Sequence, residues 1–147
     1  MQIGEIMANV VQTVHGQHSL AEAAALMQQY DIGCLLVMDG TKVDGIVTDR
    51  DLVCRGLAAE RDLTKLRITD VMTRNPVCCN NTDTLTKAAQ IMEANQVRRL
   101  PVFDRQYQLV GIVSLGDIST HASPDRAGEL IAEVSRPDSK FMEKIAS

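Results

Sequence analysis

Two short polar motifs carry residue types whose spacing could support ligand chemistry. Thr48 is followed three residues later by Asp51, and Ser114 is followed by Asp117 at the same spacing. A hydroxyl with an acid three residues on is typical of a helix capping box. The same groups at a helix start could bind a nucleoside phosphate, because unpaired N–H groups there favour phosphate and the carboxylate can accept hydrogen bonds from both ribose hydroxyls. Both interpretations are open.

A doubled arginine favours the phosphate interpretation in the second half of the chain. Arg98 and Arg99 enter a short apolar segment at the place where the first half has Gly33 and Cys34. Guanidinium groups bind phosphate oxygens bidentately. The alternative is that both arginines lie at the surface beside an acidic partner, because burying their charges unpaired would be costly.

The cysteines and histidines do not form a metal-binding pattern. The chain has no Cys-x-x-Cys pair, and the two adjacent cysteines should point to opposite faces of a strand. We expect buried, reduced thiols and no metal site. We also find no nucleophile–base pair and no glycine-rich phosphate loop, so we expect no enzymatic activity. The cysteines and histidines of the chain are Cys34, Cys54, Cys78, Cys79, His15, His18 and His121.

The chain contains one internal repeat. Residues 109–118 resemble residues 43–52 at an offset of 66, and the segments upstream match at an offset of 65. A unit of this length that occurs only twice favours a paired domain over a solenoid. Matched pairs include Ile3 with Ile68, Met7 with Met72, Leu20 with Leu85, Met27 with Met92, Val37 with Val102, and Gly45 with Gly111.

Each copy predicts the order strand, helix, strand, strand, helix, which is an α/β (α+β) fold. One-sided apolar stripes predict helices that begin after Ser19 and Thr84. Short second helices should start at residues 48 and 114, and the glycine of each closing motif should permit a tight turn. Pro101 suggests that its strand has an edge at that point. The expected strands are 12–14, 34–38, 43–47, 77–79, 99–103 and 109–113.

Length and composition favour two halves that share a core. The chain has 147 residues, of which 45% are hydrophobic, and either copy alone would be marginally stable. A net charge of −4 argues against a nucleic-acid surface. The absence of a long apolar run or signal segment predicts a cytoplasmic protein without membrane contact. The unmatched tail could form one apolar helical face, packing on the pair or on a second subunit, through Leu130, Ile131 and Val134.

The whole pattern resembles the stand-alone bacterial form of the cystathionine β-synthase (CBS) domain pair. The resemblance rests on the two closing Gly-Ile-Val-(Thr/Ser)-x-x-Asp motifs, on the matched Ile–Met segments and on the middle strands. It covers about residues 3–120. It implies two units packed with pseudo-twofold symmetry, clefts for adenosine-containing ligands, and association as a homodimer. We expect repeats at 1–62 and 63–120 and a C-terminal tail at 121–147.

The resemblance also implies roles for individual residues. Asp51 and Asp117 would bind ribose, and Thr48 and Ser114 would lie near ribose or phosphate. The first copy departs from the family pattern, because Gly33 and Cys34 replace the basic pair, although an arginine of the other half could serve its site. Residues implied to contact the base or phosphate are Asn75, Pro76, Val77, Cys78, Val97, Arg98, Arg99 and Pro101.

Two functional hypotheses follow, neither of them requiring a cofactor. The first is a regulatory ligand-sensing module that binds an adenine nucleotide such as AMP, ADP or ATP, or a related molecule such as NAD or S-adenosylmethionine. The second is a protein-interaction or dimerisation module whose clefts are vestigial. A protein target of either module cannot be named from the sequence.

Overall fold

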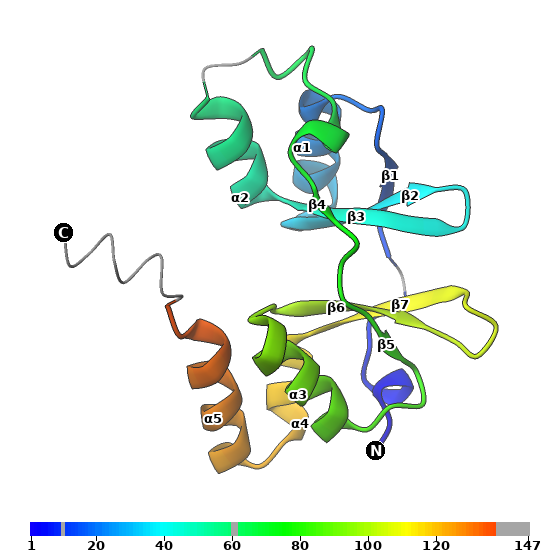
Figure 1. Cartoon of the computed structure of the whole chain (residues 1–147), viewed down its shortest axis with the longest axis vertical. Helices are drawn as coiled ribbons and strands as arrows, with labels where there is room; N and C mark the ends of the chain where they lie inside the picture. Colours follow the sequence, from blue (N-terminus) through cyan, green and yellow to red (C-terminus); the bar gives the residue numbers. More distant parts are fainter. Residues whose placement is uncertain (10, 60–61, 138–147) are drawn as a thin grey trace. The chain divides into compact units, whose positions relative to one another are not determined.

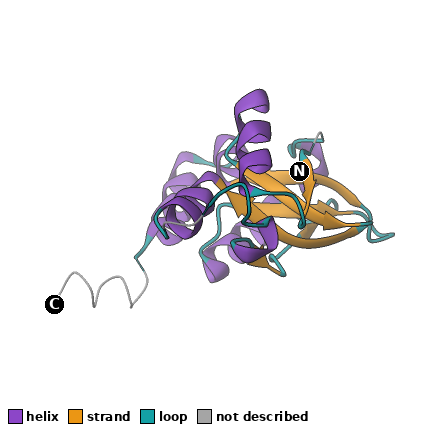
Figure 2. Cartoon of the chain, turned by 90° about the horizontal axis from the view of Figure 1, so that it is seen from above, coloured by secondary structure: helices purple, strands orange, loops and turns teal. Residues whose placement is uncertain are grey.

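The computed structural model describes residues 1–9, 11–59 and 62–137 and divides the chain into two compact units (Figure 1). The first unit is Asn9–Pro76, and the second unit combines Met1–Ala8 with the chain from Val77 onward. Both units contain helices and a sheet, so the expected mixed α+β class is confirmed (Figure 2). Among the described residues, no helix is both long and apolar enough to cross a membrane.

The first unit has a four-stranded sheet in the order β1-β2-β3-β4. The parallel pair is β1 with β2, and the other two pairs are antiparallel. Its strands are β1 (Thr13–His15), β2 (Cys34–Asp39), β3 (Lys42–Thr48) and β4 (Thr73–Arg74). Its helices are α1 (Leu20–Tyr30), α2 (Asp49–Asp51), the π-helical η2 (Leu52–Leu57) and the 3₁₀-helical η3 (Ile68–Asp70).

The second unit repeats this plan with a three-stranded sheet in the order β5-β6-β7. Its strands are β5 (Cys79–Asn80), β6 (Arg99–Phe103) and β7 (Leu109–Ser114). Its helices are η1 (Ile3–Glu5), α3 (Leu85–Asn95), α4 (Leu115–His121) and α5 (Pro124–Ser135). The predicted order strand, helix, strand, strand, helix is therefore confirmed in both copies.

The predicted caps set where the long helices begin. The Ser19 hydroxyl accepts a hydrogen bond from the Glu22 amide at 3.1 Å, and the Thr84 hydroxyl accepts one from the Lys87 amide at 3.1 Å. Both helices also end alike, in a left-handed residue that cannot continue the helix. Equivalent caps place the apolar stripes of α1 and α3 against the sheets of their own units.

Pro101 explains why β5 is shorter than β1. In the first unit Leu36, the equivalent of Pro101, donates its amide to the Gln12 carbonyl at 3.3 Å, and it pairs with Thr13. Proline has no amide to donate, and β5 pairs only with Val102 and Phe103. The expected edge at Pro101 is therefore present on the β5 side, although β6 is the central strand.

The two copies exchange their first segments. Ile3, from the start of copy one, is fully buried in the core cluster of the second unit. Ile68, from the start of copy two, is fully buried in the core cluster of the first unit together with Val71 and Met72. Each apolar core therefore needs a segment that the sequence repeat assigns to the other copy.

The glycines of the closing motifs serve this exchange and form no tight turn, so the expectation of a turn was wrong. Gly45 lies inside β3 and Gly111 inside β7. A Cβ atom on Gly111 would lie 2.5 Å from the Ala8 carbonyl oxygen and 2.7 Å from the sulfur of Met7. A Cβ on Gly45 would meet Thr73 and Met72 in the same way, at 2.6 and 2.7 Å. Only glycine lets the exchanged segment pass so close to the strand.

The unmatched tail forms α5 and packs on the second unit. Leu130 and Val134 join the core cluster of that unit, with exposed fractions of 0% and 6%. Ile131, expected on the same apolar face, is 47% exposed. An ion pair between Arg126 Nη1 and Glu93 Oε1, 2.6 Å apart, fastens α5 to α3. The part of the tail from residue 138 lies outside the described residues.

Candidate functional site

The second unit holds a compact polar group at the junction of β7 and α4. The Ser114 amide donates to Asp117 Oδ2 at 2.9 Å, and the Asp117 amide donates to Ser114 Oγ at 3.0 Å. The capping-box interpretation is therefore confirmed as local structure. Asp117 Oδ1 has no hydrogen-bond partner or ion pair within the described residues, and the residue is half-buried. A carboxylate held by one oxygen can still accept donors, such as a pair of hydroxyls, on the other.

The first unit repeats the capping box with one addition. The Thr48 amide donates to Asp51 Oδ2 at 2.9 Å, and the Asp51 amide donates to Thr48 Oγ1 at 3.2 Å. Here the second carboxylate oxygen is engaged as well, because Asp51 Oδ1 lies 3.8 Å from Arg55 Nε. Arg55 is itself held by the Val71 carbonyl oxygen, to which its Nη1 donates at 3.0 Å. The spacing of four residues between Asp51 and Arg55 is the sequence signal for this pair.

The two arginines of the second unit have different neighbours. Arg99 is the register partner of Ser114, so one strand pair brings a guanidinium-bearing residue beside the capping-box hydroxyl. Arg98 donates from Nη2 to Ser135 Oγ at 3.4 Å and thereby contacts α5. Both side chains are exposed. The surface exposure expected by the alternative therefore holds for both, but neither has an acidic partner among the described residues. Arg99 is the one whose strand position adjoins Ser114.

The first unit places different side chains at these positions. Cys34 is the register partner of Thr48, as Arg99 is of Ser114. The Asp49 carboxylate lies against Gly33, since a Cβ added there would be 2.8 Å from Asp49 Oδ2. Sequence reasoning missed Asp49, although its replacement by an apolar residue in the second copy was a readable signal. We call Gly33, Cys34, Thr48, Asp49 and Asp51 the first half-site.

The second half-site is the equivalent set of the second unit, Arg98, Arg99, Ser114, Leu115 and Asp117. The segment predicted to border a base divides between the units. Asn75 and Pro76 belong to the first, where Asn75 has a left-handed backbone (φ 49°) and donates its amide to the Asp44 carbonyl at 3.1 Å. The other predicted contacts belong to the second: Val77, Cys78, Val97 and Pro101.

These four residues of the second unit differ in burial. Pro101 is buried, Val77 and Val97 pack partly buried on the core cluster, and Cys78 is half-buried. Cys78 also lines a cavity of about 290 Å³ with Cys79, Asn80, Phe103 and Tyr107. Burial raises the pKa of the Cys78 thiol, so it is neutral at physiological pH and offers a weak donor instead of an anion.

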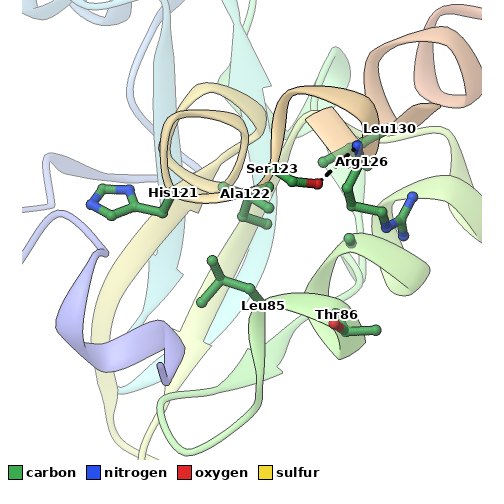
Figure 3. A pocket seen from close by; sticks show the side chains of 9 residues that line it. Leu85, Thr86, His121, Ala122, Ser123, Arg126 and Leu130 are labelled. Atoms are coloured by element: carbon green, nitrogen blue, oxygen red, sulfur yellow. Dashed lines mark hydrogen bonds between the residues drawn. The ribbon is translucent and has the colours of Figure 1, made fainter. Parts of the chain in front are cut away.

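A second cavity of the same unit lies away from the half-site residues. It measures about 250 Å³ and lies between α3, α4 and α5. Figure 3 shows Leu85 and Thr86 on one side, and Ser123 and Arg126 of the α5 start on the other. None of the predicted ligand-binding residues lines it.

The expectations about metal ligands and cysteines can be compared with the structure within the described residues. There, no group of three or more His, Cys, Asp or Glu side chains could hold a metal ion. The four cysteines, all of them among the described residues, are reduced thiols, as expected. Of these, Cys79 is buried and Cys54 is exposed, which departs from the expectation that all are buried. Burial, reinforced by the nearby Asp83 carboxylate, raises the pKa of Cys79 to about 12.

Comparison with known proteins gives consistent matches over both copies. The family model for the CBS domain matches residues 3–57 and 68–123. The protein YhcV of Bacillus subtilis (strain 168), a CBS domain-containing protein, is 36% identical over 134 residues, which are 90% of this chain and 94% of that protein.

Two solved structures with ligands are also similar. The CBS domain pair of protein MJ0100, in complex with 5′-methylthioadenosine and S-adenosyl-L-methionine, matches with a TM-score of 0.72 and 29% identity over 82% of this chain and 94% of that one. CBSX2 in complex with AMP matches with a TM-score of 0.69 and 25% identity over 85% of this chain and 98% of that one.

Proposed function

The chain belongs to the CBS domain family, and from this premise we propose that it is a ligand-sensing regulatory module that binds an adenine nucleotide. The main site is the second half-site, where Ser114, Asp117 and Arg99 serve the ribose and phosphate. Ligands of the class AMP, ADP, ATP or a related adenosine compound fit this chemistry. The complexes of similar CBS proteins with AMP and with S-adenosyl-L-methionine support an adenosine-containing ligand.

The observation that carries the proposal is the difference between the two aspartates. Asp117 keeps one carboxylate oxygen without a partner in the described residues, whereas Asp51 has Arg55 3.8 Å away. A ribose diol at Asp117 therefore displaces no ion pair, while one at Asp51 competes with a guanidinium. The second half-site also supplies the guanidinium of Arg99 for a phosphate.

The experiment is calorimetric titration of AMP into the parent chain, Asp117→Ala and Asp51→Ala. Loss of a hydrogen bond to a charged acceptor costs about 1.5–3 kcal/mol, so Asp117→Ala should weaken AMP binding by roughly 10- to 100-fold. Asp51→Ala is the matched control, because it removes the same capping box and should cost similar stability, about 1 kcal/mol. Equal AMP affinity in all three proteins, with equal losses of stability, would leave the aspartates only their capping role.

The competing function is a protein-interaction or dimerisation module. It is supported by Val53 and Leu57, which lie one turn apart on η2 and are 54% and 60% exposed. A panel of adenosine compounds that leaves the melting temperature unchanged would favour this second function.

A further inference from the structure

The two half-sites share a backbone frame, which allows their side chains to be compared position by position. The Asp49 amide donates to the Gly33 carbonyl oxygen at 3.0 Å, and the Leu115 amide donates to the Arg98 carbonyl oxygen at 2.7 Å. Each contact joins the first residue after the strand to the residue before the middle strand of the same unit. A ligand bound in the same pose at both would therefore meet different chemistry at equivalent points.

The difference is one of charge. At three equivalent positions the second half-site has Arg98, Arg99 and Leu115, whose side chains sum to +2. The first half-site has Gly33, Cys34 and Asp49, whose side chains sum to −1. The next equivalent pair is Arg50 and Gly116, and Arg50 brings the sum at the first half-site to zero. Over these four positions the two half-sites therefore differ by two unit charges. Arg99 is the register partner of Ser114, and Asp49 and Leu115 directly follow the capping-box hydroxyl residues. These positions therefore adjoin their own capping box, where charges closer than a Debye length of about 8 Å are incompletely screened by salt.

The Asp49 carboxylate has a defined place in the first half-site. Its Oδ2 lies against Gly33, where a Cβ would come within 2.8 Å, and its Oδ1 accepts a hydrogen bond from the Arg50 amide at 2.8 Å. Asp51 stands two residues further on, with its own charge partly offset by Arg55. A phosphate at the first half-site would meet the carboxylate of Asp49, whereas a phosphate at the second half-site would meet the guanidinium of Arg99.

We propose that the two half-sites select adenosine compounds by the charge of the 5′ substituent. The second half-site takes a 5′-phosphate. The first half-site takes an adenosine whose 5′ substituent is uncharged or cationic. This inference rests on the proposed function, since it presumes that Asp51 and Asp117 bind ribose, and it adds a ligand class for each site. One chain could then read two different adenosine compounds at once.

Three ligands that differ at the 5′ position separate charge from shape. AMP carries an anionic group there, adenosine a neutral hydroxyl, and 5′-amino-5′-deoxyadenosine a cation. Asp117→Asn isolates the first half-site and Asp51→Asn isolates the second, because asparagine keeps the shape and a capping oxygen. We expect the order amino compound, adenosine, AMP at the first half-site and the reverse order at the second. Two charges at about 8 Å in water correspond to a difference of roughly fivefold.

A charge substitution tests the role of Asp49 directly. In the Asp117→Asn background, Asp49→Asn should raise the affinity for AMP several-fold and lower that for the amino compound. Asp39→Asn is the matched control, because it removes the same charge from the exposed far end of β2, roughly 16 Å from Cys34 along the strand. It should change neither affinity.

The possible failures are distinguishable. If the parent chain binds none of the three compounds, the proposed function is wrong and the inference falls with it. If Asp117 supports AMP binding but the isolated first half-site binds nothing, or binds AMP at least as tightly as adenosine, the proposed function stands and the inference is overturned. Equal effects of Asp39→Asn and Asp49→Asn would also overturn it, since net charge would then be the cause.

Discussion

Replacing Gly111 by alanine should destabilise the protein, because the added Cβ atom would overlap the exchanged segment. The new Cβ would lie 2.5 Å from the Ala8 carbonyl oxygen, where ordinary contact begins near 3.4 Å. The exchanged segment must therefore retreat from β7 by roughly an ångström. This movement breaks the bridge between Ala8 and Ile112, whose two hydrogen bonds are 2.9 and 3.0 Å long.

The expected loss can be worked from these contacts. Two backbone hydrogen bonds contribute about 0.5–1.5 kcal/mol each, and forced repacking around Met7 costs about 1–3 kcal/mol. A net loss of about 2–4 kcal/mol follows, because part of each term is recovered by relaxation. For a chain near 150 residues, each kcal/mol lowers Tm by about 2–4 °C. We expect Gly111→Ala to melt about 5–15 °C below the parent chain, as measured by differential scanning calorimetry.

Gly128→Ala is the matched control. Gly128 lies within α5, and an added Cβ meets nothing within 4 Å. The same substitution there should leave Tm unchanged or raise it, since alanine favours a helix interior by about 1 kcal/mol over glycine. A Gly111→Ala protein that melts within 2 °C of the parent chain, by the same measurement, would refute the close-approach argument.

Four further predictions use other features. Fragments 1–62 and 63–147 should not melt cooperatively when expressed separately, because each lacks the exchanged segment that completes its core; two transitions near the parent Tm would contradict this. Thiol labelling of the native protein at pH 8 should modify exposed Cys54 and spare buried Cys79. The folded-state pKa of Cys79, about 12, lies above its ordinary value of 9.0, so its effect on stability is constant below pH 9 and turns unfavourable as pH rises toward 12, as urea unfolding in that range would show. Sedimentation at micromolar concentration should give a homodimer, which a strict monomer would disprove; with Leu130 and Val134 buried within the chain, Ile131→Glu then tests whether α5 forms the contact.

The sequence was sufficient to predict the elements because their signals are local. Ser19 and Thr84 cap helices as expected, and the capping boxes at Thr48 and Ser114 follow from a spacing of three residues. The shortened β5 follows from a single missing amide, which the position of Pro101 could have revealed had the register been known. Features that depend on residues close together in the sequence can therefore be predicted from it.

The exchange of first segments could not be read, because a repeat tells which residues are equivalent and not which copy they pack on. Ile3 and Ile68 match one another in either arrangement. The environment of Asp49 was missed for a related reason. Its contact with Gly33 spans the β2–β3 hairpin, and only the pairing of Cys34 with Thr48 brings the two residues together. The net charge of a site that is built across two strands can be calculated only when the register of those strands is known.

The exchanged segments also bear on how such a chain can arise. Two single-copy proteins that swapped their first segments would form a domain-swapped dimer, with the buried contacts of the repeated elements already present. Joining them end to end would keep those contacts and add the segment between residues 57 and 68, whose Leu66 is buried in the core cluster of the first unit. A duplication of this kind keeps the repeated part of each core while freeing the copies to diverge, and the charges around Gly33 and Arg98 show two copies that have done so. Mixed fragments 1–62 and 63–147 would then reassemble where neither folds alone.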